Sequence, residues 1–221
     1  GDALNDAVYN RNALIADTYN IQYHLEYADV NPMIKKMVQS GDDTYDIAYQ
    51  VLTQSTAMVT DGLLYNLYDV PHLALDMPWW DQNSVEALSV GRTLRMASAA
   101  ISVEDKNATS AILFNKDIAR DHGVGDLYAI VSEGVWTMDR MKAVYENVTT
   151  DLDGDGKMTL EDLWGFLSKR DAGYCVYFGA GGTFITKNED GTLSDSFKQG
   201  FNIEVLQKVQ DMMSDETAIY D

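Results

Sequence analysis

The chain has 221 residues, 46% of them hydrophobic and 23% charged, which suits a globular protein of one large or two small domains. Its net charge of −19 argues against nucleic-acid binding, because an acidic surface repels phosphate. A single cysteine, Cys175, excludes an intramolecular disulfide and a cysteine-based zinc site. No stretch approaches the roughly 20 apolar residues of a membrane helix, so no transmembrane segment is expected, and no signal segment is visible.

The first part of the chain alternates between helical and strand patterns. Apolar residues at spacings of three and four predict helices, and period-2 alternation predicts strands. In order, the predicted elements are a helix over 2–19, a strand over 21–27, a helix capped by Asn31 and ended by Gly41, a strand over 45–52 and a helix over 54–60. This order favours an α/β fold built on a parallel sheet, whose first strand we expect upstream of this sequence.

The second part continues the alternation. The predicted elements are a strand over 111–114, a helix over 116–122, a helix capped by Thr137, a strand over 163–168 and a helix capped by Asn202. The helix after Thr137 is expected to bury Met138, Met141, Val144, Tyr145 and Val148, and the last helix Ile203, Leu206, Val209 and Met213.

An acidic loop over 151–162 fits the twelve-residue calcium loop. Carboxylates stand at positions one, three and five, Gly156 at position six permits the turn, and a carbonyl, a hydroxyl and a last carboxylate follow. The predicted calcium ligands are Asp151, Asp153, Asp155, the carbonyl of Lys157, Thr159 and Asp162. Aspartate replaces the usual glutamate at position twelve. We therefore expect a structural calcium ion; an acidic turn that binds nothing is the alternative, and a calcium switch would need a second, paired loop.

Short segments resemble, in order along nearly the whole chain, the family 1 extracellular solute-binding proteins of bacteria. They are 1–12, 41–47, 62–67, 79–81, 114–116, 136–139 and 163–166. The resemblance implies a periplasmic-binding-protein-like fold of two α/β lobes, each with a mainly parallel sheet flanked by helices, incomplete at both ends. Lobe one would span 1–108, and part of lobe two would span 109–221 with the calcium-type loop.

The same resemblance implies a function. Such proteins bind a sugar or oligosaccharide in the cleft between the lobes and deliver it to the membrane permease of an ABC importer. They lie outside the cytoplasm, either lipid-anchored at the cell surface or in the periplasm. Binding without catalysis is expected.

Sugar recognition needs aromatic faces for the C–H side of the ring and planar polar groups for the hydroxyls. Carried over by position, the candidate ligand-binding residues are Gln50, Thr53, Gln54, Arg170, Asp171, Tyr174 and Tyr177. Each has a plainer interpretation: the glutamines as surface residues, Arg170 and Asp171 as a surface ion pair, and the tyrosines as half-buried packing.

Two other functions are the alternatives. A carbohydrate-active enzyme would need a carboxylate pair, but 35 acidic residues make some pair inevitable, and no nucleophile elbow, P-loop or dinucleotide motif is present. A calcium-dependent interaction module of the dockerin kind would need two calcium loops in tandem, and only one such loop occurs.

Overall fold

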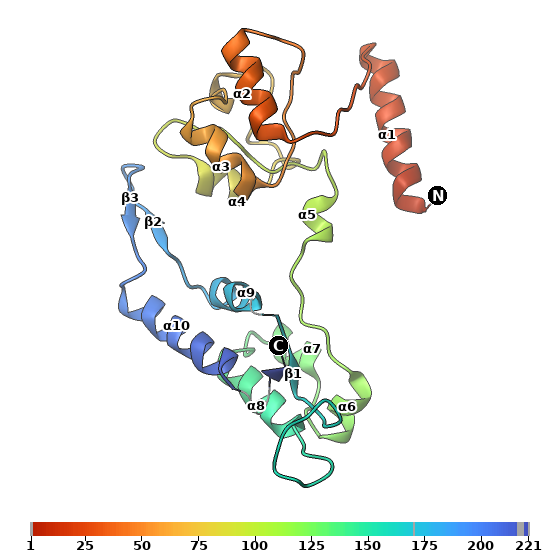
Figure 1. The fold of residues 1–221 in the computed structure, drawn as a ribbon, viewed down its shortest axis with the longest axis vertical. Coiled ribbons are helices and arrows are strands. Elements are labelled where there is room, and N and C mark those ends of the chain that lie inside the picture. The colour runs from red at the N-terminus through yellow and green to blue at the C-terminus, as the bar shows by residue number, and fades with distance from the viewer. Residues whose placement is uncertain (1, 170, 216–218, 221) are drawn as a thin grey trace. The chain divides into compact units, whose positions relative to one another are not determined.

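The computed structural model describes residues 2–169, 171–215 and 219–220. Helices dominate this part of the chain, and strands are few and short (Figure 1). The helices are α1 (Ala3–Tyr19), α2 (Val30–Ser40), α3 (Leu52–Thr60), α4 (Gln82–Leu88), α5 (Glu104–Asn107), α6 (Lys116–Asp121), α7 (Leu127–Ser132), α8 (Met138–Val148), α9 (Ala172–Gly179) and α10 (Gly200–Met213), with a 3-10 turn η1 (Leu67–Asp69). The strands are β1 (Phe166–Leu167), β2 (Ile185–Lys187), β3 (Leu193–Asp195) and β4 (Ile219–Tyr220).

Side-chain caps fix where several helices begin. Asp2 accepts a hydrogen bond from the N–H of Asn5 at 2.9 Å, and Thr137 accepts one from Arg140 at 3.2 Å, which confirms the predicted cap of α8. The predicted cap at Asn31 is wrong, because the N-cap residue of α2 is Asp29, two residues earlier, and the helix begins at Val30. Asn31 therefore lies inside the first turn, where its side chain is free to bond elsewhere.

The strands form two separate pairs. β2 and β3 make an antiparallel hairpin with Thr186 opposite Ser194, and β1 pairs in parallel with β4. Segments 21–27, 45–52 and 111–114 carry no strand in the described chain, so those three element predictions are not met. Alternating apolar and polar residues indicate a segment that could lie in a sheet. A strand forms only where a neighbouring strand bonds to its N–H and C=O groups, and the pattern does not specify that neighbour. The two-lobed, mainly parallel architecture stays a prediction.

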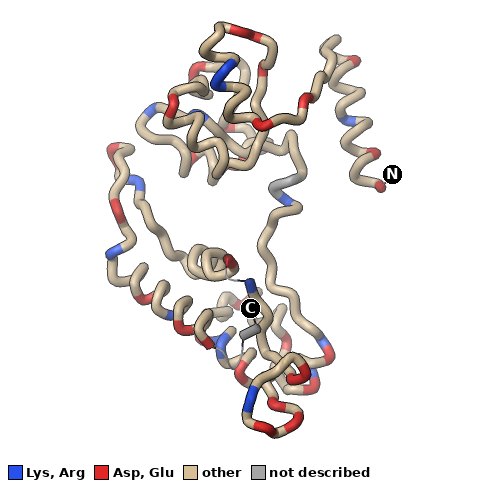
Figure 2. Tube along the Cα trace, in the orientation of Figure 1, with Lys and Arg blue, Asp and Glu red and all other residues tan. Residues whose placement is uncertain are grey.

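The chain divides into two compact units. Unit 1 comprises Gly1–Ala74 and Leu94–Ala97, and unit 2 comprises Leu75–Thr93 and Ser98–Asp221. The boundary predicted at residue 108 falls inside unit 2 and also stays a prediction. Acidic residues outnumber basic ones along both units (Figure 2). Within the described residues, no helix combines the length and the apolar character needed to cross a membrane.

Unit 1 has a small core around α2 and α3. Ile34, Met58 and Leu94 are its buried apolar side chains. Leu94 joins this unit because its carbonyl accepts the N–H of Leu67 at 2.6 Å, and its own N–H donates to the side chain of Asn66 at 2.9 Å. The predicted helix at the N-terminus is present as α1, but none of its described residues is buried.

Unit 2 has a core shared by α8, α9 and α10. One cluster joins Met141 and Tyr145 of α8 to Met212 of α10, and a second joins Tyr177 of α9 to Val205 and Val209 of α10. Of the five side chains predicted to be buried on α8, Met141, Tyr145 and Val148 are buried, which confirms the prediction for these three, while Met138 and Val144 are half-buried.

The buried face of α10 agrees only in part with the predicted one: Val209 is buried as predicted, and Leu206 and Met213 are partly buried and pack against the same core. The helix begins at Gly200, and Asn202 lies inside it, only 3% exposed. The Asn202 side chain accepts from the N–H of Thr183 at 2.8 Å and donates to the carbonyl of Ser196 at 2.6 Å. These two bonds turn Asn202 inward, so Val205 and Met212 are buried while the predicted Ile203 is 48% exposed.

Candidate functional site

The acidic loop over 151–162 connects α8 to β1 in unit 2. Its base is closed by an antiparallel bridge in which Thr150 and Leu163 exchange N–H···O bonds of 2.9 and 3.0 Å. Beside the bridge, the Thr149 hydroxyl donates to the Tyr145 carbonyl at 2.9 Å and accepts from the N–H of Gly165 at 3.1 Å. A Cβ at Gly165 would overlap the carbonyl oxygen of Tyr145, so only glycine permits this close approach to α8. The loop therefore projects from a fixed base.

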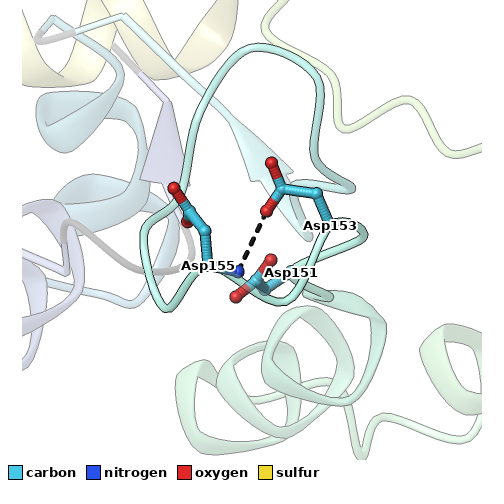
Figure 3. Close-up of side chains that lie close together, drawn as sticks. All are labelled: Asp151, Asp153 and Asp155. Atoms are coloured by element: carbon cyan, nitrogen blue, oxygen red, sulfur yellow. Dashed lines mark hydrogen bonds between the residues drawn. The ribbon is translucent and has the colours of Figure 1, made fainter.

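Three carboxylates converge inside the loop (Figure 3). One ligand oxygen from each of Asp151, Asp153 and Asp155 lies within 4.8 Å of the other two. Turn hydrogen bonds set this arrangement: the N–H of Asp155 donates to Asp153 at 3.0 Å, and the N–H of Lys157 donates to Asp155 at 2.8 Å. Gly156 has a φ of +82°, a conformation that other residues rarely adopt.

Two carboxylates are held at both oxygens by backbone N–H groups. Asp151 accepts from Gly154 at 2.7 Å and Gly156 at 2.8 Å. Asp162 accepts from Leu152 at 2.8 Å and Thr159 at 2.6 Å. These hydrogen bonds lower the pKa of each carboxyl below its usual value. For Asp151 the largest contribution comes from the N–H of Gly156, followed by Gly154, and for Asp162 from the N–H of Leu152, followed by Thr159.

The donors fit a hard cation. Calcium takes six to eight oxygen ligands, and ionised carboxylates at alternate positions are its typical protein donors. Asp153 and Asp155 each use one oxygen in a turn bond, so the other oxygen of each is left to bind a cation. Asp162 lies outside the cluster of three, and Thr159 donates its hydroxyl to Asp162 at 3.0 Å. The three carboxylates of Asp151, Asp153 and Asp155 therefore define a candidate cation site.

Two of the three candidate ligand residues of unit 1, Gln50 and Gln54, are hydrogen-bonded to Asn31. The Gln50 carboxamide donates to the Asn31 side chain at 2.8 Å, and Asn31 in turn donates to the Gln54 carbonyl at 2.9 Å. Thr53 and Gln54 lie in the first turn of α3 and are exposed. Asn31 was not among the predicted site residues. Its position before Pro32 suggested a helix cap, and no sequence signal linked it to a glutamine 19 residues away.

The candidate residues of unit 2 lie at α9, while Arg170 lies outside the described residues. Asp171 is the N-cap residue of α9, where its side chain makes no cap hydrogen bond. Tyr174 follows within the first turn and is 63% exposed.

Tyr177 is only 2% exposed, and its hydroxyl donates to the Thr183 carbonyl at 3.0 Å. Its ring stacks on Phe184 at 4.9 Å, and Gly182 packs so closely that a Cβ there would lie 2.5 Å from the ring. Of the two tyrosines, Tyr174 is therefore the one that presents an open ring.

No protein-family model matches the chain, and neither a curated protein nor a solved structure is significantly similar to it. The likeness to solute-binding proteins therefore depends on the ordered segments of the sequence alone.

Proposed function

We propose that this chain is part of the solute-binding component of a bacterial ABC importer, and that it binds a carbohydrate without transforming it. The ordered sequence segments support the family. The structural observation that carries carbohydrate binding is the pair formed by Asp171 and Tyr174, a carboxylate without a cap bond and an exposed ring at the start of one helix. In this proposal the protein acts outside the cytoplasm and passes its ligand to the membrane permease.

The chemistry of this pair suits a sugar. The face of Tyr174 can cover the apolar C–H side of a pyranose, and a carboxylate at Asp171 can accept hydrogen bonds from its hydroxyls. Residues three apart on a helix are neighbours on one surface, so both groups can reach the same ligand. Tyr177 does not share this role in the proposal, because its ring is covered by Phe184 and Gly182.

Unit 1 contributes carboxamides to the proposed ligand set. Gln50, half-buried, is oriented by its bond to Asn31, while Thr53 and Gln54 are exposed in the first turn of α3. A carboxamide both donates and accepts, as a sugar hydroxyl does, so an oriented Gln50 would discriminate among hydroxyl positions. The ligand is proposed to lie in the cleft that the family resemblance implies.

A structural calcium ion at the acidic loop belongs to the same proposal. The carboxylates of Asp151, Asp153 and Asp155 would bind it, with the Lys157 carbonyl, Thr159 and Asp162 as further oxygen donors. The ion would neutralise the repulsion among three clustered carboxylates. It would thereby stabilise the connection between α8 and β1.

The test is calorimetric titration of the purified protein with neutral mono- and oligosaccharides, in calcium and again in chelator. We expect saturable binding of one sugar class, weakened roughly tenfold or more by Tyr174→Ala because a stacking face is lost. Tyr65→Ala is the matched control, since Tyr65 is 86% exposed in unit 1 and is not a candidate ligand residue. If the Tyr174→Ala variant binds the sugar as tightly as the unaltered protein, α9 is not part of the binding site. Turnover of the sugar would favour an enzyme.

A further inference from the structure

Unit 2 contains a pocket that none of the candidate ligand residues lines. It has a volume of about 520 Å³ and lies over α6, the beginning of α7 and the glycine-containing turn between them. This volume falls within the roughly 300–1,000 Å³ of small-molecule sites. The pocket lies wholly within residues 114–128, so one short stretch of chain builds it.

The floor and one wall of the pocket are apolar. Ala119 and Leu127 are buried beneath it. The rings of Phe114 and Tyr128 form the wall, with their centroids 5.4 Å apart and their planes at 60°. Tyr128 is 61% exposed, so part of its side chain is open to a ligand. Such a wall suits a ligand with one apolar face.

Donors and an acceptor border this wall. Lys116 places its ammonium 5.4 Å from the centroid of the Tyr128 ring, and it makes no ion pair with any described residue. Asp126 accepts the N–H groups of Tyr128 and Ala129 at Oδ1, at 2.9 and 3.2 Å, so Oδ2 can accept from a ligand. Gly123 and Gly125, both at positive φ, bring backbone to the edge without side chains in the way.

The local charge disfavours an anion. Arg120 also lines the pocket, but its guanidinium is paired with Asp117 at 2.7 Å and Asp121 at 3.0 Å. With Asp126, three carboxylates stand here against two cations, in a chain whose net charge is −19. A neutral ligand with several hydroxyls can accept a hydrogen bond from Lys116 and donate one to Asp126 without adding charge to the pocket.

We infer that this pocket binds one neutral sugar unit, with the sugar ring on Tyr128 and its hydroxyls bonded to Lys116 and Asp126. The site shares no residue with the set at Asp171 and Tyr174. The inference therefore holds even if Asp171 and Tyr174 bind no ligand. If they do bind sugar, this pocket is a second carbohydrate site on the same chain.

The experiment follows backbone amide signals of the ¹⁵N-labelled full chain by NMR while glucose, galactose, mannose or xylose is added. We expect saturable shifts at Gly123, Gly125 and Tyr128 with at least one sugar. Tyr128→Ala should weaken that binding by roughly tenfold, and Tyr128→Phe should keep it, because the ring and not the hydroxyl supplies the stacking face. Because Tyr128 is exposed, both variants should fold, and the dispersion of the remaining amide signals checks this directly.

Two comparisons make the test specific. Tyr174→Ala should leave the shifts at Gly123 and Gly125 unchanged; their loss would merge this pocket with the other site and overturn the inference. Glucuronate should bind more weakly than glucose, and tighter binding of glucuronate would overturn the neutral class of ligand. The inference also fails if no sugar gives saturable shifts, or if Tyr128→Ala binds as well as the unaltered protein.

Discussion

Replacing Asp153 by asparagine removes one of the three clustered carboxylates while keeping an oxygen that can accept the N–H of Asp155. The fold of the loop should therefore survive, and the loss should fall on cation binding. A ligand at one hundred times its Kd stabilises the folded state by about 2.7 kcal/mol. For a chain of this size each kcal/mol changes Tm by roughly 2–4 °C, so saturating calcium should raise Tm by about 5–11 °C.

The assay is thermal unfolding of the unaltered protein and two variants, each in calcium and in chelator. Asp153→Asn should lose most of the calcium-dependent rise. In chelator its Tm should equal or slightly exceed that of the unaltered protein, because one of three mutually repelling charges is gone. Glu161→Gln is the matched control: it removes the same charge from the same loop at a residue that is not a predicted ligand, and it should keep the rise. Calcium binding by the loop is contradicted if the unaltered protein has the same Tm in calcium and in chelator, or if Glu161→Gln loses the calcium-dependent rise and Asp153→Asn keeps it.

Three further predictions concern stability, measured in chelator. The pKa values of Asp151 and Asp162 are lower in the folded state than their usual 3.8, so the stability they contribute is present above pH 3.8 and is lost as pH falls through the lower, folded values; acid titration followed by circular dichroism checks this, and stability that does not fall there would contradict it. Tyr145→Phe should leave Tm unchanged or raise it, because the buried Tyr145 hydroxyl has no hydrogen-bond partner among the described residues, whereas Tyr177→Phe should cost about 1 kcal/mol in a denaturant titration by breaking a bond; the reverse order would contradict both assignments. Asn202→Ala should lower the free energy of unfolding by about 2–4 kcal/mol, since two bonds from a buried side chain are lost, and a change below about 0.5 kcal/mol would show that the bonds do not hold α10.

Local signals predicted local structure well. Thr137 marks the start of α8, and the apolar spacing after it identifies Met141, Tyr145 and Val148 as buried, because a helix satisfies its own backbone and needs only one covered face. The acidic loop is local in the same sense. Its turns are made by hydrogen bonds between residues two to five positions apart, such as the bond from the N–H of Asp155 to Asp153.

Features that depend on distant partners could not be predicted in this way. The alternation over 21–27 indicates a strand but names no neighbour to pair with. Asn202 resembles a helix cap in sequence, yet it is turned inward by Thr183, 19 residues away. Tyr177 resembles an exposed stacking ring, and its burial follows from packing against Phe184 and Gly182. In each case a tertiary contact decides between two interpretations that the local sequence leaves open.

We propose that the chain binds a carbohydrate and does not transform it. The most direct measurement is calorimetric titration with neutral sugars, followed by chromatography of the recovered ligand. We predict saturable binding of one sugar class, weakened by Tyr174→Ala and not by Tyr65→Ala, with the sugar recovered intact. Absence of binding across the neutral sugars, or recovery of cleaved sugar, would contradict the claim.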